Sequence, residues 1–233
     1  GAAVIGGLIY VPGGLDETER VRDTLEVYDP EADTWKTLAS LPTPLCAYAI
    51  VPFEEGFYLF GGWDGKDYRA SVYRYEVPSN IWHEGIPMET ARAFAAAALL
   101  EDRIYLVGGY DGTREFSSCH SYDPSLAVEG KNPWRKHTPM TISRAGHAMT
   151  ASQGSLYVIG GGLVNNFTYN ERYDVGNNAW ASFESPFLDE WRTLGLSTVN
   201  AKDGAYLYAI GGWNRNYLGV VETYQASFRV YLP

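Results

Sequence analysis

The chain of 233 residues is poor in cysteine, histidine and lysine, and no long apolar run interrupts it. Its two cysteines, Cys46 and Cys119, lie in unrelated sequence contexts, which favours buried free thiols over a disulfide or a metal site. No stretch reaches the roughly 18 apolar residues of a membrane-spanning helix, so no membrane span is expected. The chain begins with Gly1 in the middle of an expected strand, and we therefore expect that a segment preceded it.

Basic residues are also in the minority. Lysine and arginine together number 18 against 28 aspartates and glutamates, which gives a formal charge of −10. Nucleic-acid affinity rests on clustered basic side chains that neutralise phosphates. The charge balance therefore predicts no nucleic-acid partner. Arginine outnumbers lysine by thirteen to five, and arginine can hold a planar anion with two parallel hydrogen bonds.

What the sequence has in abundance is glycine, tyrosine and tryptophan, arranged in a repeat. Glycine pairs recur at intervals of 48, 47, 52 and 51 residues, at Gly13/Gly14, Gly61/Gly62, Gly108/Gly109, Gly160/Gly161 and Gly211/Gly212. Repeats of roughly 50 residues are typical of the four-stranded blades of a β-propeller. The spacing therefore predicts one all-β domain over residues 1–233, with repeats at about 1–40, 41–87, 88–139, 140–187 and 188–233.

Each repeat contains the pattern of a four-stranded antiparallel meander. In the second repeat the expected strands are 47–51, 57–60 and 72–77, followed by a short outer strand around Trp82. The other repeats place their expected strands in the same order around the glycine pair, at 2–5, 8–11 and 24–28, at 93–100, 104–107 and 117–122, at 148–151, 156–159 and 170–173, and at 196–200, 205–210 and 220–224. The third repeat has a longer turn within 125–133, and the fifth has Tyr231 where the others have tryptophan. Helix-like periodicity is nearly absent.

The combined motif resembles the kelch repeat. An apolar strand, two glycines, an acidic or amide turn, a tyrosine and a later tryptophan follow one another, as in Tyr28-Asp29-Pro30 with Trp35 and Tyr122-Asp123-Pro124 with Trp134. The resemblance covers nearly the whole chain and implies a kelch-type β-propeller. Members of this family usually have six or seven blades, whereas five are visible here. Either five blades close into a ring or the chain is a fragment of a larger propeller.

The loops between the second and third strands of each repeat share one end of the propeller with the loops that connect the blades. We call this end the loop face; its second-to-third loops are Leu15 to Asp23, Trp63 to Arg69, Tyr110 to Glu115, Gly162 to Tyr169, and Trp213 to Leu218. Large flat aromatic side chains beside short polar groups suit both protein hot spots and sugar rings. The ligand-binding candidates on these loops are Trp63, Asp64, Tyr110, Asp111, Asn165, Trp213 and Asn214. Aspartate and glycine also suit tight turns, so part of this set is expected to be scaffold.

Three arginines enter the first strands of their repeats, namely Arg92, Arg144 and Arg192. Arg92 and Arg144 each stand 16 residues before a glycine pair, and Arg192 stands 19 before its pair. The resemblance implies that arginines near the channel mouth hold acidic peptides or sugar acids in some members. The alternative is that these guanidinium groups bond loop carbonyls between blades.

Catalytic and metal-binding chemistry finds little support in the sequence. The four histidines are scattered over different strands and loops, and only His147 is expected to face the channel. A copper-radical oxidase, another member of the kelch-like propellers, would need converging histidine and tyrosine ligands. The carboxylates Asp64, Asp111 and Glu115 all lie on turns where acidic residues are expected anyway. We expect no cofactor, no metal and no catalytic residue.

The sequence thus predicts a non-catalytic module that presents its loop face to a protein or peptide, with the arginines favouring an anionic one. A propeller that binds carbohydrate or isomerises a sugar acid, and a structural module of a longer extracellular chain, are the two rival interpretations, because propellers host all three. The compartment is not determined. The scarcity of lysine and the loops rich in tyrosine and asparagine lean towards a secreted or cell-surface bacterial protein.

Overall fold

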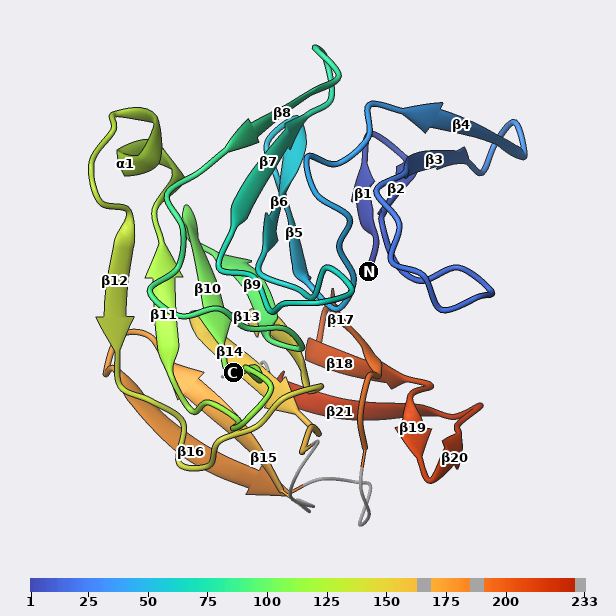
Figure 1. Ribbon diagram of the computed structural model, residues 1–233. Coiled ribbons are helices and arrows are strands. Elements are labelled where there is room, and N and C mark those ends of the chain that lie inside the picture. Colours follow the sequence, from blue (N-terminus) through green and yellow to red (C-terminus); the bar gives the residue numbers. More distant parts are fainter. Residues whose placement is uncertain (163–168, 185–190, 229–233) are drawn as a thin grey trace.

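A computed structural model describes residues 1–162, 169–184 and 191–228 of the chain. It confirms an all-β protein of the kelch-propeller type, with five antiparallel blades arranged around a common centre (Figure 1). Blade 1 contains β1 (Ala3–Ile5), β2 (Leu8–Pro12), β3 (Leu25–Asp29) and β4 (Thr34–Leu38). Blade 2 contains β5 (Ala49–Phe53), β6 (Gly56–Phe60), β7 (Val72–Glu76) and β8 (Ile81–Glu84).

The next three blades follow the same order. Blade 3 contains β9 (Ala96–Leu100), β10 (Arg103–Val107), β11 (Cys119–Tyr122) and β12 (Trp134–His137). Blade 4 contains β13 (Ala148–Ser152), β14 (Ser155–Ile159), β15 (Tyr169–Asp174) and β16 (Ala179–Glu184). Blade 5 has β17 (Gly195–Asn200), β18 (Gly204–Ile210) and β21 (Val221–Phe228), and a separate hairpin of β19 (Trp213–Asn214) and β20 (Asn216–Tyr217).

One element, a short helix, differs from the sequence prediction, and one predicted residue lies outside the described residues. The long turn of the third repeat contains a short helix, α1 (Pro124–Val128), which begins because the Asp123 side chain accepts hydrogen bonds from the amides of Ser125 and Leu126. Proline at the first turn suits this start, since it needs no amide partner there. Tyr231 of the fifth repeat lies outside the described residues. The assignment of the whole chain to a single domain, and the repeat boundaries, stay predictions.

The glycine pairs are required where each second strand turns out of its blade. Both members of every pair have positive φ, a region that costs other residues energy. Space is restricted as well: a Cβ on Gly108 would lie 2.5 Å from the carbonyl oxygen of Arg144 and 2.5 Å from Cε1 of His147. The glycines therefore let the segment that enters one blade lie directly against the turn of the preceding blade.

The hydrophobic core is divided into four clusters, each shared by two neighbouring blades. A tyrosine of each second strand fills the space towards the following blade; in blades 1 to 4 it is buried and stands at Tyr10, Tyr58, Tyr105 and Tyr157. Tyr75, Tyr122 and Tyr173 on the third strands are also buried and complete the packing. We call each shared cluster with its flanking contacts a junction. Among the described residues no cluster joins blade 5 to blade 1.

Polar clamps reinforce these junctions at the outer strands. Asn80 Oδ1 accepts a hydrogen bond of 2.9 Å from the amide of Ala39, and Trp82 Nε1 donates one of 2.9 Å to the carbonyl oxygen of the same residue. Asn178 and Trp180 hold the amide and carbonyl of Thr138 in the same way, at 3.0 and 2.7 Å. One backbone residue of the preceding blade is thus held at both of its polar groups.

Candidate functional site

The structure places Arg92 and Arg144 inside the junctions. Arg92 is 3% exposed, and its Nη1 donates to the carbonyl oxygen of Gly108 at 2.9 Å and to Ser118 Oγ at 2.7 Å. Arg144 is fully buried, and its Nη1 donates to the carbonyl oxygen of Gly160 at 3.0 Å. Each guanidinium therefore bonds the first glycine of the pair in its own blade. This geometry is that of the scaffold alternative, in which the arginines bond blade carbonyls.

Arg192 does not occupy the equivalent position, because Trp191 does. The carbonyl oxygen of Trp191 accepts from the amide of Gly161 at 2.7 Å, as that of Arg144 does from Gly109 at 3.0 Å. Its Nε1 donates to the carbonyl oxygen of Gly211 at 2.6 Å, which replaces the arginine contact of the preceding blades. Arg192 follows one residue later, with its guanidinium carbon 5.1 Å from the ring centroid of Trp213. The strands β17 and β18 contain six and seven residues against five each in β13 and β14, and this longer hairpin explains the offset in the sequence spacing.

The two aspartates of the candidate set hold their own turns. Asp64 Oδ1 accepts from the amides of Lys66 and Asp67 at 2.8 and 2.7 Å, and the carboxylate pairs with Arg69. Asp111 Oδ1 accepts from the hydroxyl and amide of Thr113 and from the amide of Arg114.

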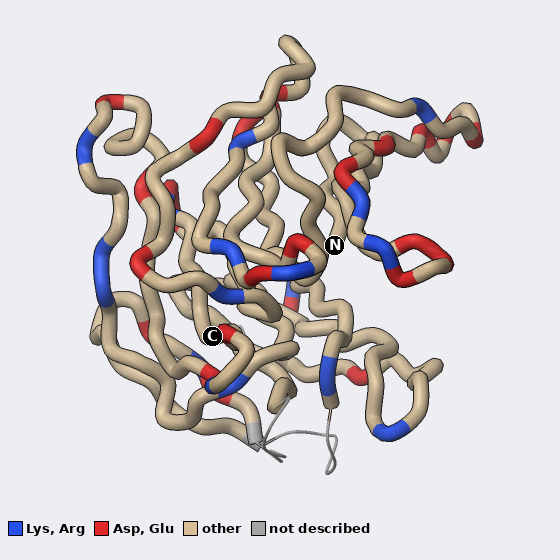
Figure 2. The backbone as a smooth tube through the Cα atoms, viewed as in Figure 1, with Lys and Arg blue, Asp and Glu red and all other residues tan. Residues whose placement is uncertain are grey.

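These hydrogen bonds favour the charged carboxylates, so the pKa of Asp64 is lowered and that of Asp111 falls to about 2. Figure 2 shows that these loops and the loop of residues 15–23 each carry both acidic and basic residues. Three arginines of these loops pair with turn aspartates, Arg22 with Asp16, Arg69 with Asp64 and Arg114 with Asp111.

The aromatic candidates are half-buried and held by short β-bridges. Trp63 bridges both Cys46 and Tyr68, Tyr110 bridges Ala93 and Glu115, and Trp213 bridges Arg192. The structure therefore brings each aromatic candidate together with the segment that enters its own blade. Asn214 is half-buried in β19, opposite Asn216. Asn165 lies outside the described residues.

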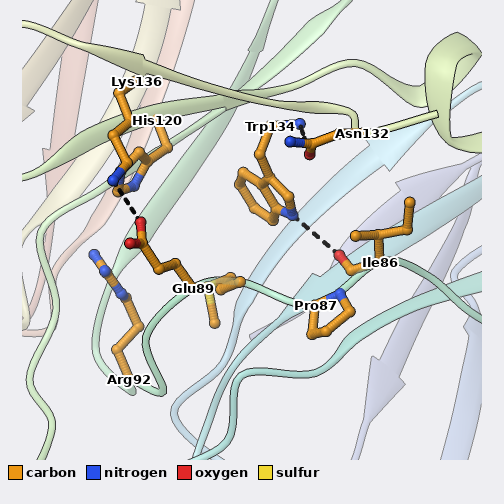
Figure 3. A pocket seen from close by; sticks show the side chains of 9 residues that line it. Ile86, Pro87, Glu89, Arg92, His120, Asn132, Trp134 and Lys136 are labelled. Atoms are coloured by element: carbon orange, nitrogen blue, oxygen red, sulfur yellow. Dashed lines mark hydrogen bonds and ion pairs between the residues drawn. The ribbon is translucent and has the colours of Figure 1, made fainter.

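A pocket of about 400 Å³ opens at the junction of blades 2 and 3, and sequence reasoning missed it. Its apolar wall is formed by Trp134, Ile86, Pro87 and Met88, and its polar groups are Glu89, Arg92, His120, Asn132 and Lys136 (Figure 3). We call it the Trp134 pocket. Lys136 Nζ and Glu89 Oε2 form an ion pair of 2.6 Å across it, and Trp134 Nε1 donates to the carbonyl oxygen of Ile86 at 3.0 Å.

Burial is the main cause of the pKa shifts of Arg92 and His120 in the pocket. It lowers the pKa of Arg92 to about 10, so this group stays cationic at neutral pH. Burial, with smaller contributions from the charges of Arg92 and Lys136, lowers the pKa of His120 to about 4. His120 is therefore neutral at pH 7.

His147, the one histidine expected at the channel, is buried at the junction of blades 3 and 4. Burial and the neighbouring Arg144 lower its pKa to about 3. Within residues 1–162, 169–184 and 191–228 no group of three or more potential metal-ligating side chains comes together. Over the same residues, none of the helices has the length and apolar character of a membrane span.

Comparison with known proteins agrees with this architecture. The family model of the KLHDC2/KLHL20/DRC7 Kelch-repeats domain matches residues 1–212. The chain belongs to the kelch-repeat family. Kelch-like protein 4 from Homo sapiens is 40% identical over 76 residues, which are 33% of this chain and 11% of that protein.

Two further relatives show the same pattern of coverage. Beta-scruin from Limulus polyphemus is 32% identical over 104 residues, 42% of this chain and 11% of that protein. Kelch-like protein 41a from Danio rerio is 28% identical over 219 residues, 88% of this chain and 34% of that protein. The kelch chain thus spans about a third or less of these relatives. None of the similarities supports a secreted location or carbohydrate binding.

Two features of this kelch chain could have been found by aligning its repeats. An asparagine or aspartate stands two residues before each tryptophan of the outer strands, at Asp33, Asn80, Asn132 and Asn178. Asn80 and Asn178 of this set form the clamps to the preceding blade. The residue two positions before the third-strand tyrosine varies from blade to blade, at Glu26, Tyr73, His120, Glu171 and Glu222. In blade 3 the residue at this position, His120, lines the Trp134 pocket.

Proposed function

We propose that this kelch propeller is a non-catalytic module that binds a protein or peptide through its loop face. The observation that carries the proposal is the set of half-buried aromatic side chains, Trp63, Tyr110 and Trp213, on loops tied by β-bridges to neighbouring segments. Tyrosine and tryptophan dominate protein hot spots because they contribute a large contact area with few rotatable bonds. A fixed backbone further reduces the ordering cost of binding.

Charge contributes less to this proposal than the sequence suggested. Arg92 and Arg144 bond blade carbonyls, and Asp64 and Asp111 are paired within their own turns. An anionic preference of the loop face therefore does not follow from these residues. Tyr217, which is 92% exposed beside Trp213 in the β19–β20 hairpin, adds a further aromatic contact at the same end of blade 5.

Selection of peptides from a random displayed library tests the proposal. Peptides enriched on the wild-type protein should lose at least about tenfold in affinity against Trp63→Ala or Tyr110→Ala, as expected for aromatic hot spots. The control is Trp35→Ala, because Trp35 is also exposed, at 58%, but lies on the outer strand β4. Thermal melting verifies that each variant is folded. Equal binding by all variants would contradict the loop-face assignment.

A glycan array addresses the carbohydrate alternative with the same proteins. We expect no glycan to bind, since neither the comparisons nor the paired loop carboxylates favour a sugar site. Glycan binding that disappears in Trp213→Ala and persists in Trp35→Ala would replace the protein-binding proposal by the carbohydrate one.

A further inference from the structure

Blades 3 and 4 differ in the hydrogen-bond partners of their buried arginines, Arg92 and Arg144. In blade 4, Glu171 on β15 is fully buried, and its Oε2 accepts from Arg144 Nη2 at 2.8 Å. Its Oε1 accepts from the amide of Thr141 at 2.7 Å. A carboxylate thus binds a guanidinium and a loop amide at once, in the geometry that carboxylates favour in proteins.

In blade 3 the same position holds a different residue. His120 stands two residues before Tyr122, as Glu171 stands two before Tyr173, and Arg92 stands 16 residues before its glycine pair, as Arg144 does. Glu89 precedes Arg92 by three residues, as Thr141 precedes Arg144. Among the described residues no hydrogen bond reaches Arg92 Nη2 or the amide of Glu89. In blade 4 the equivalent two donors both bond the carboxylate of Glu171, whereas blade 3 has no carboxylate at that position.

The missing carboxylate coincides with open space. The Trp134 pocket, of about 400 Å³, is lined by Arg92 and His120 at its polar end and by Trp134 and Ile86 at its apolar end. Figure 3 shows the Arg92 guanidinium and the Glu89 carboxylate facing this space, with the carboxylate joined to Lys136. The Glu89 and Lys136 side chains are both 70% exposed, so this pair is free to move aside.

The local charge suits a single negative group. Arg92 is a buried cation whose charge is partly offset by the nearby carboxylates of Asp111 and Glu89, Glu89 is itself paired with Lys136, and His120 is neutral at pH 7. A buried cation loses its hydration, and this costs free energy unless an anion lies next to it. The low dielectric of the interior also strengthens the attraction between the two charges. An arriving carboxylate would therefore complete a pair that blade 4 contains within its own chain.

We propose that the Trp134 pocket binds a carboxylate attached to a flat apolar group. The carboxylate accepts hydrogen bonds from Arg92 Nη2 and the Glu89 amide, as Glu171 does from Arg144 and Thr141, and the apolar group packs against the Trp134 ring. This site lies at the junction of blades 2 and 3 and uses none of the aromatic residues assigned to the loop face. It therefore stands or fails independently of the proposed function.

Calorimetric and NMR titration with 3-phenylpropionate tests the proposal on the whole protein. We expect saturable binding with a dissociation constant on the order of 1 mM or tighter, in the range expected of a small ligand. The matched probe is 3-phenylpropanamide, which has the same shape without the charge and should bind at least about tenfold more weakly. Chemical-shift changes at the Trp134 indole and the His120 ring identify the pocket.

Three substitutions test whether binding depends on this pocket or on the overall charge of the protein. His120→Glu places an internal carboxylate where blade 4 has Glu171, so it should abolish binding of 3-phenylpropionate. His120→Gln changes the same residue without adding charge and should leave binding within about threefold, since a neutral side chain still faces the carboxylate. Glu129→Gln removes an exposed carboxylate beyond α1 and should have no effect. Thermal melting verifies the fold of each variant.

A peptide version of the probe distinguishes the source of the carboxylate. Tighter binding of an N-acetylated phenylalanyl-glutamate amide than of 3-phenylpropionate indicates a peptide ligand, and the reverse order indicates a small organic acid; either order supports the site. The proposal is overturned if neither carboxylate binds at millimolar concentration, if the propanamide binds equally well, or if His120→Glu and His120→Gln bind alike.

Discussion

The junctions inside the propeller and the outward faces of its end blades are built from equivalent residues with different surroundings. Leu59 of blade 2 is fully buried, whereas Val11, which stands at the same place before the glycine pair of blade 1, is half-buried. Ile159 of blade 4 is buried, whereas its equivalent Ile210 in blade 5 is 47% exposed. Burial at these positions is determined by the presence of a neighbouring blade.

The polar clamps show the same contrast. Trp82, Trp134 and Trp180 each donate to a carbonyl of the preceding blade, at 2.9, 3.0 and 2.7 Å. Trp35 of blade 1 has the same sequence context but is 58% exposed, and its one ring contact within the described residues is with Tyr28 of its own blade, at 4.9 Å between ring centroids. A tryptophan at the equivalent position therefore stabilises a junction in blades 2 to 4 and lies on the surface in blade 1.

The largest expected effect comes from deleting a junction side chain. Leu59→Ala should lower the free energy of unfolding by about 2–5 kcal/mol, because it removes a fully buried side chain and leaves a cavity. Val11→Ala, at the equivalent end position, should cost less than about 1.5 kcal/mol, since this side chain is already partly in water. Urea denaturation of both variants measures the difference. Equal costs would mean that the outward face of blade 1 is packed as tightly as a junction.

Acid should weaken the junction of blades 3 and 4. The pKa of His147 is lowered in the fold from 6.5 to about 3, so the folded protein binds this proton less readily than the unfolded chain does. The stabilisation that depends on neutral His147 is therefore fully present above pH 6.5 and is lost as the pH falls towards 3. At pH 5 the free energy of unfolding should be lower by roughly 2 kcal/mol.

The slope of stability against pH between 7 and 5 is the quantity to measure. The lowered pKa values of His120 and His137 act in the same direction, so wild type must be compared with His147→Gln. The variant should have a shallower slope. An unchanged slope would show that His147 is not the group that resists protonation.

Loss of one clamp hydrogen bond should have a smaller effect. Trp82→Phe keeps the aromatic ring but removes the Nε1 donor to Ala39, which should cost about 1 kcal/mol. Trp35→Phe removes a donor that has no such partner in the described residues and should change stability by only a few tenths of that amount. Paired thermal melts compare the two. A cost for Trp35→Phe as large as that for Trp82→Phe would break the distinction between junction and end face.

The smallest effect is expected on the outward face of blade 5. Val199 on β17 is 49% exposed, so Val199→Thr should alter the free energy of unfolding by no more than about 0.5 kcal/mol. A guanidinium denaturation curve suffices to measure it. A loss above about 1 kcal/mol would indicate that this face is covered in solution.

The fold could be predicted because its main determinants are local and repeated. The glycine pairs need positive φ wherever the second strand leaves the blade, and the tyrosines fill the same space in each junction. The position of Arg192 could not be placed correctly, since counting residues back from Gly211 does not show that the β17–β18 hairpin after Trp191 is longer than the β13–β14 hairpin. Only the backbone contact of Trp191 with Gly161 fixes the register.

The candidate site was harder to predict, because it depends on which partner each side chain finds. Asp64 and Asp111 look alike as ligand groups and as turn residues, and their hydrogen bonds identify them as turn residues in the structure. The Trp134 pocket is lined by His120 where blade 4 has the carboxylate of Glu171, and this difference becomes apparent only beside the Arg144–Glu171 pair. Residues 89, 120 and 134 lie on three separate segments, so no local motif contains them.

The clamp that Asn80 and Trp82 place on Ala39 has a consequence for how the propeller unfolds. Each clamp and each core cluster couples a blade only to its immediate neighbour. Stability then behaves as a chain of nearest-neighbour interactions, so a blade held on one side opens at lower free energy than one held on both. Native-state hydrogen exchange should therefore show the amides of β2 and β18 exchanging before those of β6 and β10, as a gradient from the ends of the array to its middle.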